Sequence, residues 1–237
     1  ENLEALRNMM IAEYCMANSD VLGLEYDALK TPYTEVQDKD YATFHALFYN
    51  QDLSSVFEKI YIELVYDEEA DKALRDMCDD IVEGYRDVIN EADWLTEETR
   101  KSLIEKLDGI IFLTAKDIDV NELDTDLANC FTGNYFDTQE NIEELRKKET
   151  VENLIEGTDR TFIMMPMHEV NACYSPYMNN VTITLAIQAY PFFSKDESFG
   201  FNLAGLGGTI SHEIGHAFDS EGIKYDKNGT YNPGWIC

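Results

Sequence analysis

The pentapeptide His212-Glu213-Ile214-Gly215-His216 is the stretch of this sequence whose residue types and spacing most clearly indicate chemistry. Residues i and i+4 of an α-helix project from the same face, so His212 and His216 can offer two imidazole nitrogens to one metal ion. Glu213 stands beside the first histidine, where its carboxylate can reach a water molecule at that metal. The H-E-x-x-H spacing on a helix therefore predicts a zinc site with a neighbouring general base.

Peptide hydrolysis is the reaction that this set of groups favours. Zinc lowers the pKa of a bound water molecule toward about 7 and polarises a carbonyl group. Glu213, which is not itself a ligand, can take the proton from that water and deliver it to the leaving amine. A catalytic zinc ion of this kind needs a third protein ligand. No histidine occurs in residues 217–222, so we expect a carboxylate from elsewhere.

A helical wheel separates the two histidines from the apolar face of the same helix. The apolar positions fall within about 80° of one another: Leu203, Leu206, Ile210, Ile214 and Ala217. The histidines lie on the opposite side, as an active-site cleft requires, rather than in the core stripe. Gly205 and Gly208 lie on the histidine side and leave room for another segment to approach. The helix is expected to begin near Asn202 and to end near Ser220 or Gly222.

Asp219 follows His216 by three residues and lies on the same side of this helix. It is a candidate acceptor for an imidazole N–H, which would place it behind the metal ligand. The alternative is a carboxylate that closes the helix in solvent. The remaining histidines, His45 and His168, have no comparable context and are expected to be structural.

Composition limits the classes of partner. The chain has 47 acidic and 18 basic residues and a net charge of −29, and no basic patch is visible, so nucleic acid is not an expected partner. No apolar run is long enough to span a membrane. Five scattered cysteines form no C-x-x-C pair, which predicts buried free thiols rather than a structural zinc site.

The chain divides by pattern into a helical lobe, residues 1–137, and a partial catalytic lobe, residues 138–237, that ends after the H-E-x-x-H helix. Thr96 is predicted to cap a helix that ends at Gly109. Several other segments have helical periodicity: residues 3–14, 54–64, 68–89 and 138–148. Short apolar runs of strand length occur at Ile110–Ala115 and Phe162–Met167. Val170–Tyr174 and Val181–Leu185 are predicted to pair as a hairpin.

Several further stretches make the pattern specific to one family. In chain order they are Trp94-Leu95-Thr96-Glu97-Glu98-Thr99, Val170-Asn171-Ala172-Cys173-Tyr174-Ser175-Pro176, Ile187-Gln188-Ala189-Tyr190-Pro191-Phe192-Phe193, Phe201-Asn202-Leu203-Ala204-Gly205-Leu206-Gly207, the segment 212–219, and Tyr225-Asp226-Lys227-Asn228-Gly229. In this order and spacing the chain resembles the neprilysin / endothelin-converting enzyme family of zinc metalloendopeptidases. The resemblance implies a mainly α fold with a small β component (α+β), in which a helical lobe precedes part of a thermolysin-like zincin lobe. It also implies one zinc ion and peptide substrates.

The resemblance assigns roles to residues outside the metal motif. It implies that Asn171 and Ala172 lie on an edge strand and hydrogen-bond the backbone of an extended substrate, which is a sensible form of strand addition. It implies that Ile187 and Phe192 line the pocket for the residue after the scissile bond; ordinary core packing is the alternative for both. The chain departs from the family at Gly208-Thr209, where a bulky apolar pair is usual, and at Thr184-Leu185-Ala186, where Pro-Ala-Gly-like residues are usual. The size of the pocket and its preference for large apolar residues therefore need not follow those of the family.

Length separates the chain from a complete member of the family. The resemblance places the third zinc ligand in an E-N-x-x-D-like motif several dozen residues after H-E-x-x-H, and residues 217–237 do not contain it. We therefore expect an internal fragment of a larger peptidase that is catalytically incomplete by itself. The competing hypothesis is a non-catalytic helical binding module that keeps a decayed motif. By resemblance the parent protein is expected to be extracellular or associated with the cell envelope.

Overall fold

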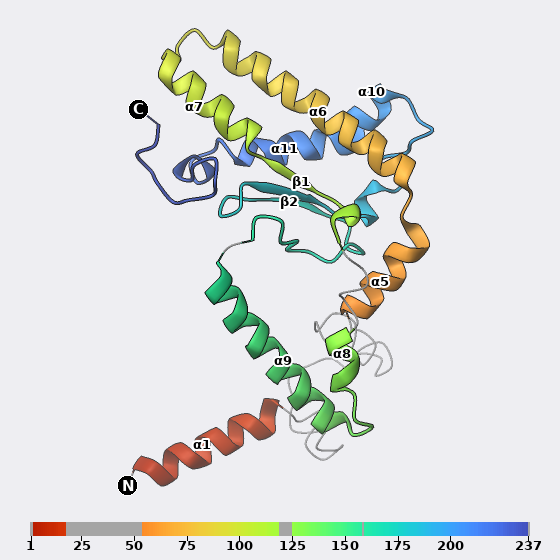
Figure 1. The fold of residues 1–237 in the computed structure, drawn as a ribbon, viewed down its shortest axis with the longest axis vertical. Helices are drawn as coiled ribbons and strands as arrows, with labels where there is room; N and C mark the ends of the chain where they lie inside the picture. The colour runs from red at the N-terminus through yellow and green to blue at the C-terminus, as the bar shows by residue number, and fades with distance from the viewer. Residues whose placement is uncertain (1, 18–53, 119–124, 158, 237) are drawn as a thin grey trace, which may run out of the picture. The chain divides into compact units, whose positions relative to one another are not determined.

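The computed structural model describes residues 2–17, 54–118, 125–157 and 159–236 (Figure 1). The chain forms two compact units. One comprises residues 1–54 and 124–150, and the other comprises residues 55–123 and 151–237. The predicted lobe boundary after residue 137 stays a prediction.

The first unit contains helix α1 (Asn2–Ala17), helix α8 (Thr125–Cys130) and most of helix α9 (Tyr135–Glu156). Helix α1 agrees with the predicted periodicity. Its apolar side chains Leu6, Met9 and Met10 are each at least half exposed.

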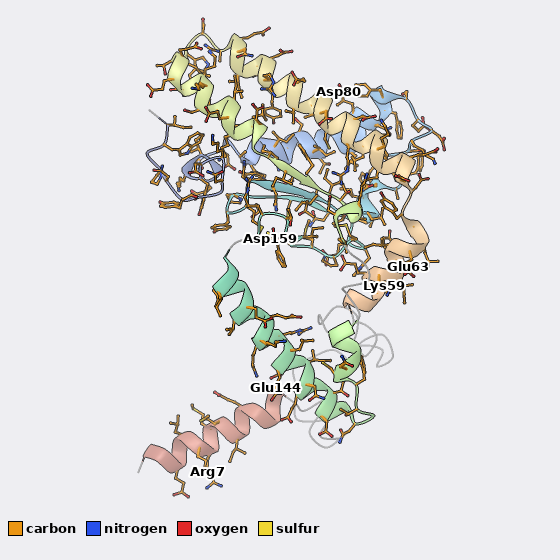
Figure 2. All side chains as sticks on the ribbon, viewed as in Figure 1. Arg7, Lys59, Glu63, Asp80, Glu144 and Asp159 are labelled. Atoms are coloured by element: carbon orange, nitrogen blue, oxygen red, sulfur yellow. The ribbon has the colours of Figure 1, made fainter. Side chains whose placement is uncertain are left out.

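The second unit begins with three helices: α5 (Ser54–Val65), α6 (Glu68–Glu91) and α7 (Glu97–Asp108). The Asp67 side chain caps α6 by accepting hydrogen bonds from two backbone N–H groups. Thr96 caps α7 by accepting from the Thr99 N–H at 3.1 Å, and the helix ends at Gly109, as the sequence predicts. The acidic side chains Glu63 and Asp80 point away from these helices into solvent (Figure 2).

A three-stranded sheet lies beside these helices in the order β1-β3-β2. Strand β1 (Ile111–Leu113) is parallel to β3 (Asn180–Ile183), and β2 (Ala172–Ser175) pairs with β3 in the predicted antiparallel hairpin. The apolar run 162–167 does not form a strand. Its last residue, Met167, is instead fully buried in a small second cluster, and its N–H donates to the Glu58 carboxylate at 2.8 Å.

The main core lies between one face of this sheet and helices α6, α7 and α11 (Gly208–His216), which lie on the same side of the sheet (Figure 1). Val181 and Ile183 alternate on β3 and both point into this core. Among the described cysteine side chains, those of Cys78 and Cys130 are buried, that of Cys173 is partly buried, and none forms a disulfide, as predicted; the side chains of Cys15 and Cys237 lie outside the described residues. The observed fold is therefore mainly helical with a small sheet, and this prediction is confirmed. None of the described helices is long and apolar enough to cross a membrane.

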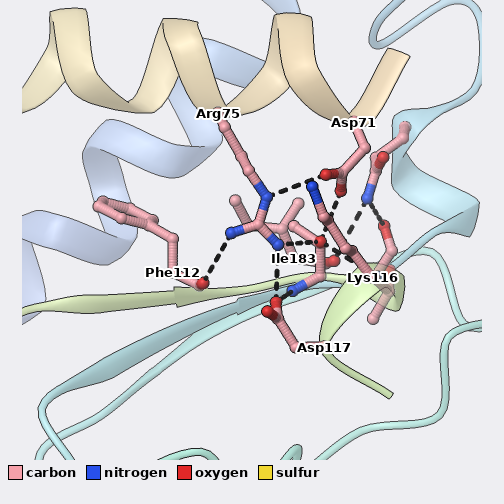
Figure 3. Close-up of polar contacts among 9 residues, drawn as sticks. Asp71, Arg75, Phe112, Lys116, Asp117 and Ile183 are labelled. Atoms are coloured by element: carbon pink, nitrogen blue, oxygen red, sulfur yellow. Dashed lines mark hydrogen bonds and ion pairs between the residues drawn. The ribbon is translucent and has the colours of Figure 1, made fainter. Parts of the chain in front are cut away.

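Arg75 joins helix α6 to the end of strand β1 (Figure 3). Its guanidinium donates to the Asp71 carboxylate at 2.9 Å, to the Asp117 carboxylate at 2.7 Å and to the Thr114 hydroxyl at 2.6 Å. The Thr114 hydroxyl donates in turn to Asp71 at 2.5 Å. Asp71 is only 2% exposed, so these hydrogen bonds replace the contacts with water that its carboxylate loses on burial.

We expect Arg75→Met to lower the free energy of unfolding by about 2–3 kcal/mol, because it leaves a buried carboxylate with a single hydroxyl donor. Urea unfolding of the chain measures this change. Arg86→Met is the matched control on the same helix, since the carboxylates that pair with Arg86 are 66% and 49% exposed. The control should change stability by less than about 1 kcal/mol. Equal effects of the two substitutions would contradict the assignment.

Candidate metal centre

The metal-binding motif lies at the end of a continuous helical segment. This segment comprises a short α-helical turn, α10 (Phe199–Asn202), a π-helical turn, η5 (Leu203–Gly207), and α11 (Gly208–His216). The predicted start near Asn202 was three residues late. The predicted end near Ser220 or Gly222 was wrong, because the backbone folds back after His216 onto the side chain of Asp219.

The π-helical turn changes which residues face the core. Leu206, Ile210, Ile214 and Ala217 are fully buried, as the wheel predicts, but Leu203 is 40% exposed. A wheel with 100° per residue fails here because a π-turn closes with i→i+5 bonds and rotates each residue by less. The turn also directs the Leu206 N–H to the Phe192 carbonyl at 2.9 Å. Gly205 permits this approach, since a Cβ there would lie 2.3 Å from that same oxygen.

His212 and His216 converge on one point. Their Nε2 atoms lie 3.1 Å apart, and the possible ligand atoms of His212, Glu213 and His216 all lie within 4.8 Å of one another. Two nitrogens bound tetrahedrally to one zinc ion at about 2.0–2.1 Å would be about 3.3 Å apart. The imidazole pair therefore fits zinc without rearrangement of the helix.

Asp219 orients the second of these imidazoles. Its Oδ2 atom lies 2.7 Å from His216 Nδ1, and its Oδ1 atom accepts hydrogen bonds from the N–H groups of Glu221 and Gly222. The contact with His216 and these N–H groups lower the pKa of Asp219 to about 2, so the carboxylate is an acceptor. The Nδ1 atom of His216 must then carry the hydrogen, which leaves the lone pair of Nε2 available to a metal.

Glu213 is held by the neighbouring sheet. The side chain is only 9% exposed, and its Oε2 atom accepts a hydrogen bond from the backbone N–H of Tyr174 at 2.9 Å. Tyr174 lies on β2, an edge strand of the sheet, so a strand amide fixes the predicted base beside the histidines. The sequence signals a strand at this position but does not reveal the contact.

Comparison with known proteins agrees with this geometry. Two family models, both described as peptidase family M13, match residues 1–114 and 171–237 and together cover more than half of the chain. The chain belongs to peptidase family M13. The predicted resemblance to the neprilysin and endothelin-converting enzyme family is thereby confirmed.

Several relatives and solved structures are similar to this M13 chain. A neutral endopeptidase of Lactobacillus helveticus is 26% identical over 99% of the chain and 37% of the relative. A neutral endopeptidase of Lactococcus lactis subsp. lactis is 32% identical over 77% of the chain and 29% of the relative. The crystal structure of the Mycobacterium tuberculosis zinc metalloprotease Zmp1 with an inhibitor has 27% identity and a TM-score of 0.68, with 86% of this chain and 30% of that one covered. The chain thus spans about a third of the length of these proteins.

The M13 chain places Asn171 and Ala172 at the start of the edge strand. Backbone groups alternate along a strand, so those of Ala172 point to the same free edge as the Tyr174 N–H that meets Glu213. Thr184, at a position where the chain departs from the family pattern, holds this end of the hairpin. Its hydroxyl lies 3.2 Å from the Asn171 N–H and 2.7 Å from the Asn171 carbonyl. The substrate-binding role of Asn171 and Ala172 stays a prediction.

The two residues predicted to line a substrate pocket lie in different environments. Ile187 is 6% exposed and belongs to the main core, which agrees with the packing alternative. The Phe192 side chain is 41% exposed, and its backbone carbonyl contacts the π-helical turn. The pocket role of both residues stays a prediction.

Lys106 is a buried residue near the metal centre that the motifs did not single out for a role there. Its side chain is fully buried, and its ammonium group donates to the carbonyls of Gly222 and Tyr225 at 2.6 and 2.7 Å. The group also lies 5.5 Å from the centroid of the Trp235 ring. Burial lowers the pKa of Lys106 to about 8.

This pKa predicts a stability that increases with pH in one window. The unfolded chain keeps the Lys106 proton up to about pH 10.5 and the folded chain only up to about pH 8, so the unfolded state binds more protons between these values. The free energy of unfolding of the wild type, relative to Lys106→Met, should therefore rise by about 1–3 kcal/mol from pH 8 to pH 10.5. Urea titrations at several pH values measure it, with the exposed Lys72→Met as control. The expectation would be refuted if the difference in free energy of unfolding between the wild type and Lys106→Met did not change with pH.

Proposed function

We propose that the full-length protein containing this M13 chain is a zinc-dependent endopeptidase or oligopeptidase. The observation that carries the proposal is the 3.1 Å separation of the His212 and His216 Nε2 atoms, with a buried glutamate held beside them. The relatives described as neutral endopeptidases and as a zinc metalloprotease support the same activity.

Each residue has a distinct task in this proposal. His212 and His216 hold the metal, and Asp219 keeps His216 in the tautomer whose Nε2 can bind it. Zinc, when bound, supplies a Lewis acid that polarises the peptide carbonyl and favours ionisation of water. Glu213 is the general base: one carboxylate oxygen is fixed by the Tyr174 N–H, and the other is available to take a proton from water and pass it to the leaving amine.

The substrate in this proposal is a peptide in extended conformation. The free edge of β2 offers the carbonyl of Ala172, two residues before the amide that holds Glu213, while the Ala172 N–H donates to the Asn171 side chain at 2.9 Å. A peptide that pairs with this edge would have its scissile bond close to the histidines. In this proposal Asn171, which is exposed just before the strand, binds the substrate backbone through its side-chain NH₂ group.

We further propose that residues 1–237 alone bind zinc weakly and do not cleave peptides. Among the described residues, the cluster that could hold a metal contains two imidazoles and the glutamate assigned as base. Two ligands leave zinc one protein ligand short of a catalytic site. The alternative, a non-catalytic helical binding module, would be favoured if the full-length protein bound peptides and zinc but did not hydrolyse them.

Metal analysis of the full-length protein, combined with a peptide-cleavage assay, tests the proposal. We expect one zinc ion per chain, loss of cleavage on chelation, and recovery when zinc is added back. Calorimetric zinc titration of residues 1–237 should show markedly weaker binding than that of the full-length protein. Cleavage that persists after complete removal of the metal would refute the zinc mechanism.

A further inference from the structure

We propose that Lys106 is a positioning residue for the metal ligand His216, acting through the turn Asp219–Gly222. The inference rests on the proposed role of His216 as a zinc ligand. Lys106 lies on α7, more than a hundred residues before the motif, and it touches neither imidazole. Its effect on the metal must therefore be transmitted by the backbone that it holds.

The hydrogen bonds form an unbroken path from the lysine to the imidazole. The Lys106 ammonium donates to the Gly222 carbonyl at 2.6 Å. The Gly222 N–H donates to Asp219 Oδ1 at 2.8 Å, and Asp219 Oδ2 lies 2.7 Å from His216 Nδ1. Lys106 holds one end of this path and the metal-binding imidazole forms the other.

The turn cannot move without disturbing Asp219. Gly222 passes so close to the end of helix α11 that a Cβ there would lie 1.8 Å from the His216 carbonyl oxygen. Asp219 takes two of its three hydrogen bonds from backbone N–H groups of this turn, at Glu221 and Gly222. A shift of Gly222 would therefore remove the contacts that fix the Asp219 rotamer, and with it the orientation of the His216 ring.

Lys106 and Trp235 clamp the segment that follows the turn. The lysine donates to the carbonyls of Gly222 and Tyr225, and the Trp235 indole N–H donates to the intervening Ile223 carbonyl at 2.7 Å. The indole ring also faces the ammonium, which is a favourable cation–π arrangement. Three carbonyls of residues 222–225 are thus held by side chains from outside the turn.

An apolar side chain would fill this buried position without the expense of burying a cation. A carboxylate partner does not explain why a lysine occupies this position, because the hydrogen-bond acceptors of its ammonium group in the described structure are two carbonyl oxygens. The ammonium is the one feature of Lys106 that Met of similar length lacks, so Lys106→Met isolates the donor function from packing.

The experiment compares the wild type and Lys106→Met by Co²⁺ titration of the metal-free full-length protein and by ¹⁵N NMR of the 237-residue chain with histidine-selective labelling. We expect Lys106→Met to weaken Co²⁺ binding by about tenfold, the range found when groups behind a metal ligand are removed. In the metal-free chain, the NMR signature of the Nδ1–H tautomer of His216 should weaken in parallel. Ile89→Ala is the control, because it destabilises the core in α6 and removes no contact of the turn.

A double-mutant cycle with Asp219→Ala tests the path itself. If Lys106 acts through Asp219, Lys106→Met should have no further effect on Co²⁺ affinity once Asp219 is removed. Additive effects of the two substitutions on Co²⁺ affinity would overturn the proposal. It would also be overturned if Lys106→Met were destabilised as much as Ile89→Ala but kept the Co²⁺ affinity and the His216 tautomer of the wild type. Should Lys106→Met not fold, Trp235→Leu releases the same segment and is expected to shift both readouts in the same direction; an unchanged affinity and tautomer would overturn the proposal equally.

The outcomes separate this inference from the proposed function. A full-length wild type that binds no Co²⁺ at His212 and His216 would refute the metal site, whereas equal binding by the wild type and Lys106→Met would refute only the role of Lys106. The tautomer measurement is made without metal and reports on the path in either case.

Discussion

Glu213→Gln in the full-length protein is expected to lower kcat for peptide cleavage by about 10²–10⁴-fold, the usual contribution of a positioned general base. The amide keeps the size of the side chain and can still accept a hydrogen bond from the Tyr174 N–H. It cannot take a proton from water at neutral pH. The zinc content should be unchanged, because the imidazoles of His212 and His216 provide the motif's ligands.

Steady-state kinetics and metal analysis of the same preparation check this expectation. Glu197→Gln is the control, since Glu197 is an exposed glutamate outside the metal centre. It should leave kcat within about twofold of the wild type, as is usual for surface substitutions. A Glu213→Gln protein with full zinc content and near wild-type kcat would exclude Glu213 as the base. Loss of zinc in this variant would instead indicate that Glu213 is a ligand.

Ile210→Ala is expected to lower the free energy of unfolding by about 2–5 kcal/mol. Ile210 is fully buried in the main core, on the face of α11 opposite the histidines. The substitution removes the transfer energy of the lost methyl and methylene groups and leaves a cavity between α11 and its neighbours. Because α11 carries the metal ligands, zinc affinity should fall in the same variant.

Val88→Ala on α6 is the control, because Val88 is 67% exposed and should change stability by less than about 0.5 kcal/mol. Urea unfolding of the two variants and the wild type, fitted with a common slope, gives the comparison. An Ile210→Ala chain as stable as the Val88→Ala chain would show that this part of the helix is not packed as the structure indicates.

Local sequence signals accounted for much of the fold. Thr96 and Gly109 mark the ends of α7 because a hydroxyl can accept from N–H groups at the first turn and a glycine suits the last. The β-rich segments Val170–Tyr174 and Val181–Leu185 and the spacing between them predicted the hairpin, although the observed strands are shifted by one or two residues. These features depend on neighbours within a few positions, so the sequence alone reveals them.

The pattern failed where contacts from elsewhere override local preference. Residues 162–167 have the composition of a strand, but the Met167 side chain packs in a separate hydrophobic cluster and its N–H donates to the Glu58 carboxylate. Leu203 has the spacing of a core residue, but the π-helical turn that meets Phe192 rotates it outward. In both cases the deciding partner is distant in sequence and leaves no periodic signal.

The contacts of the candidate site likewise divide into those set by local sequence and those set by distant segments. The sequence by itself determined the pairing of His212 with His216 and the adjacent Glu213, because these three residues lie within two turns of one helix and helix geometry fixes their relative positions. Asp219 reaches His216 as predicted, although it lies in the turn after this helix. Only the tertiary structure decided that the Tyr174 amide holds Glu213 and that Lys106 holds the turn behind His216. These contacts join residues 39 and 116 positions apart, and they form where β2 packs against α11 and where Lys106 of α7 meets residues 222–225.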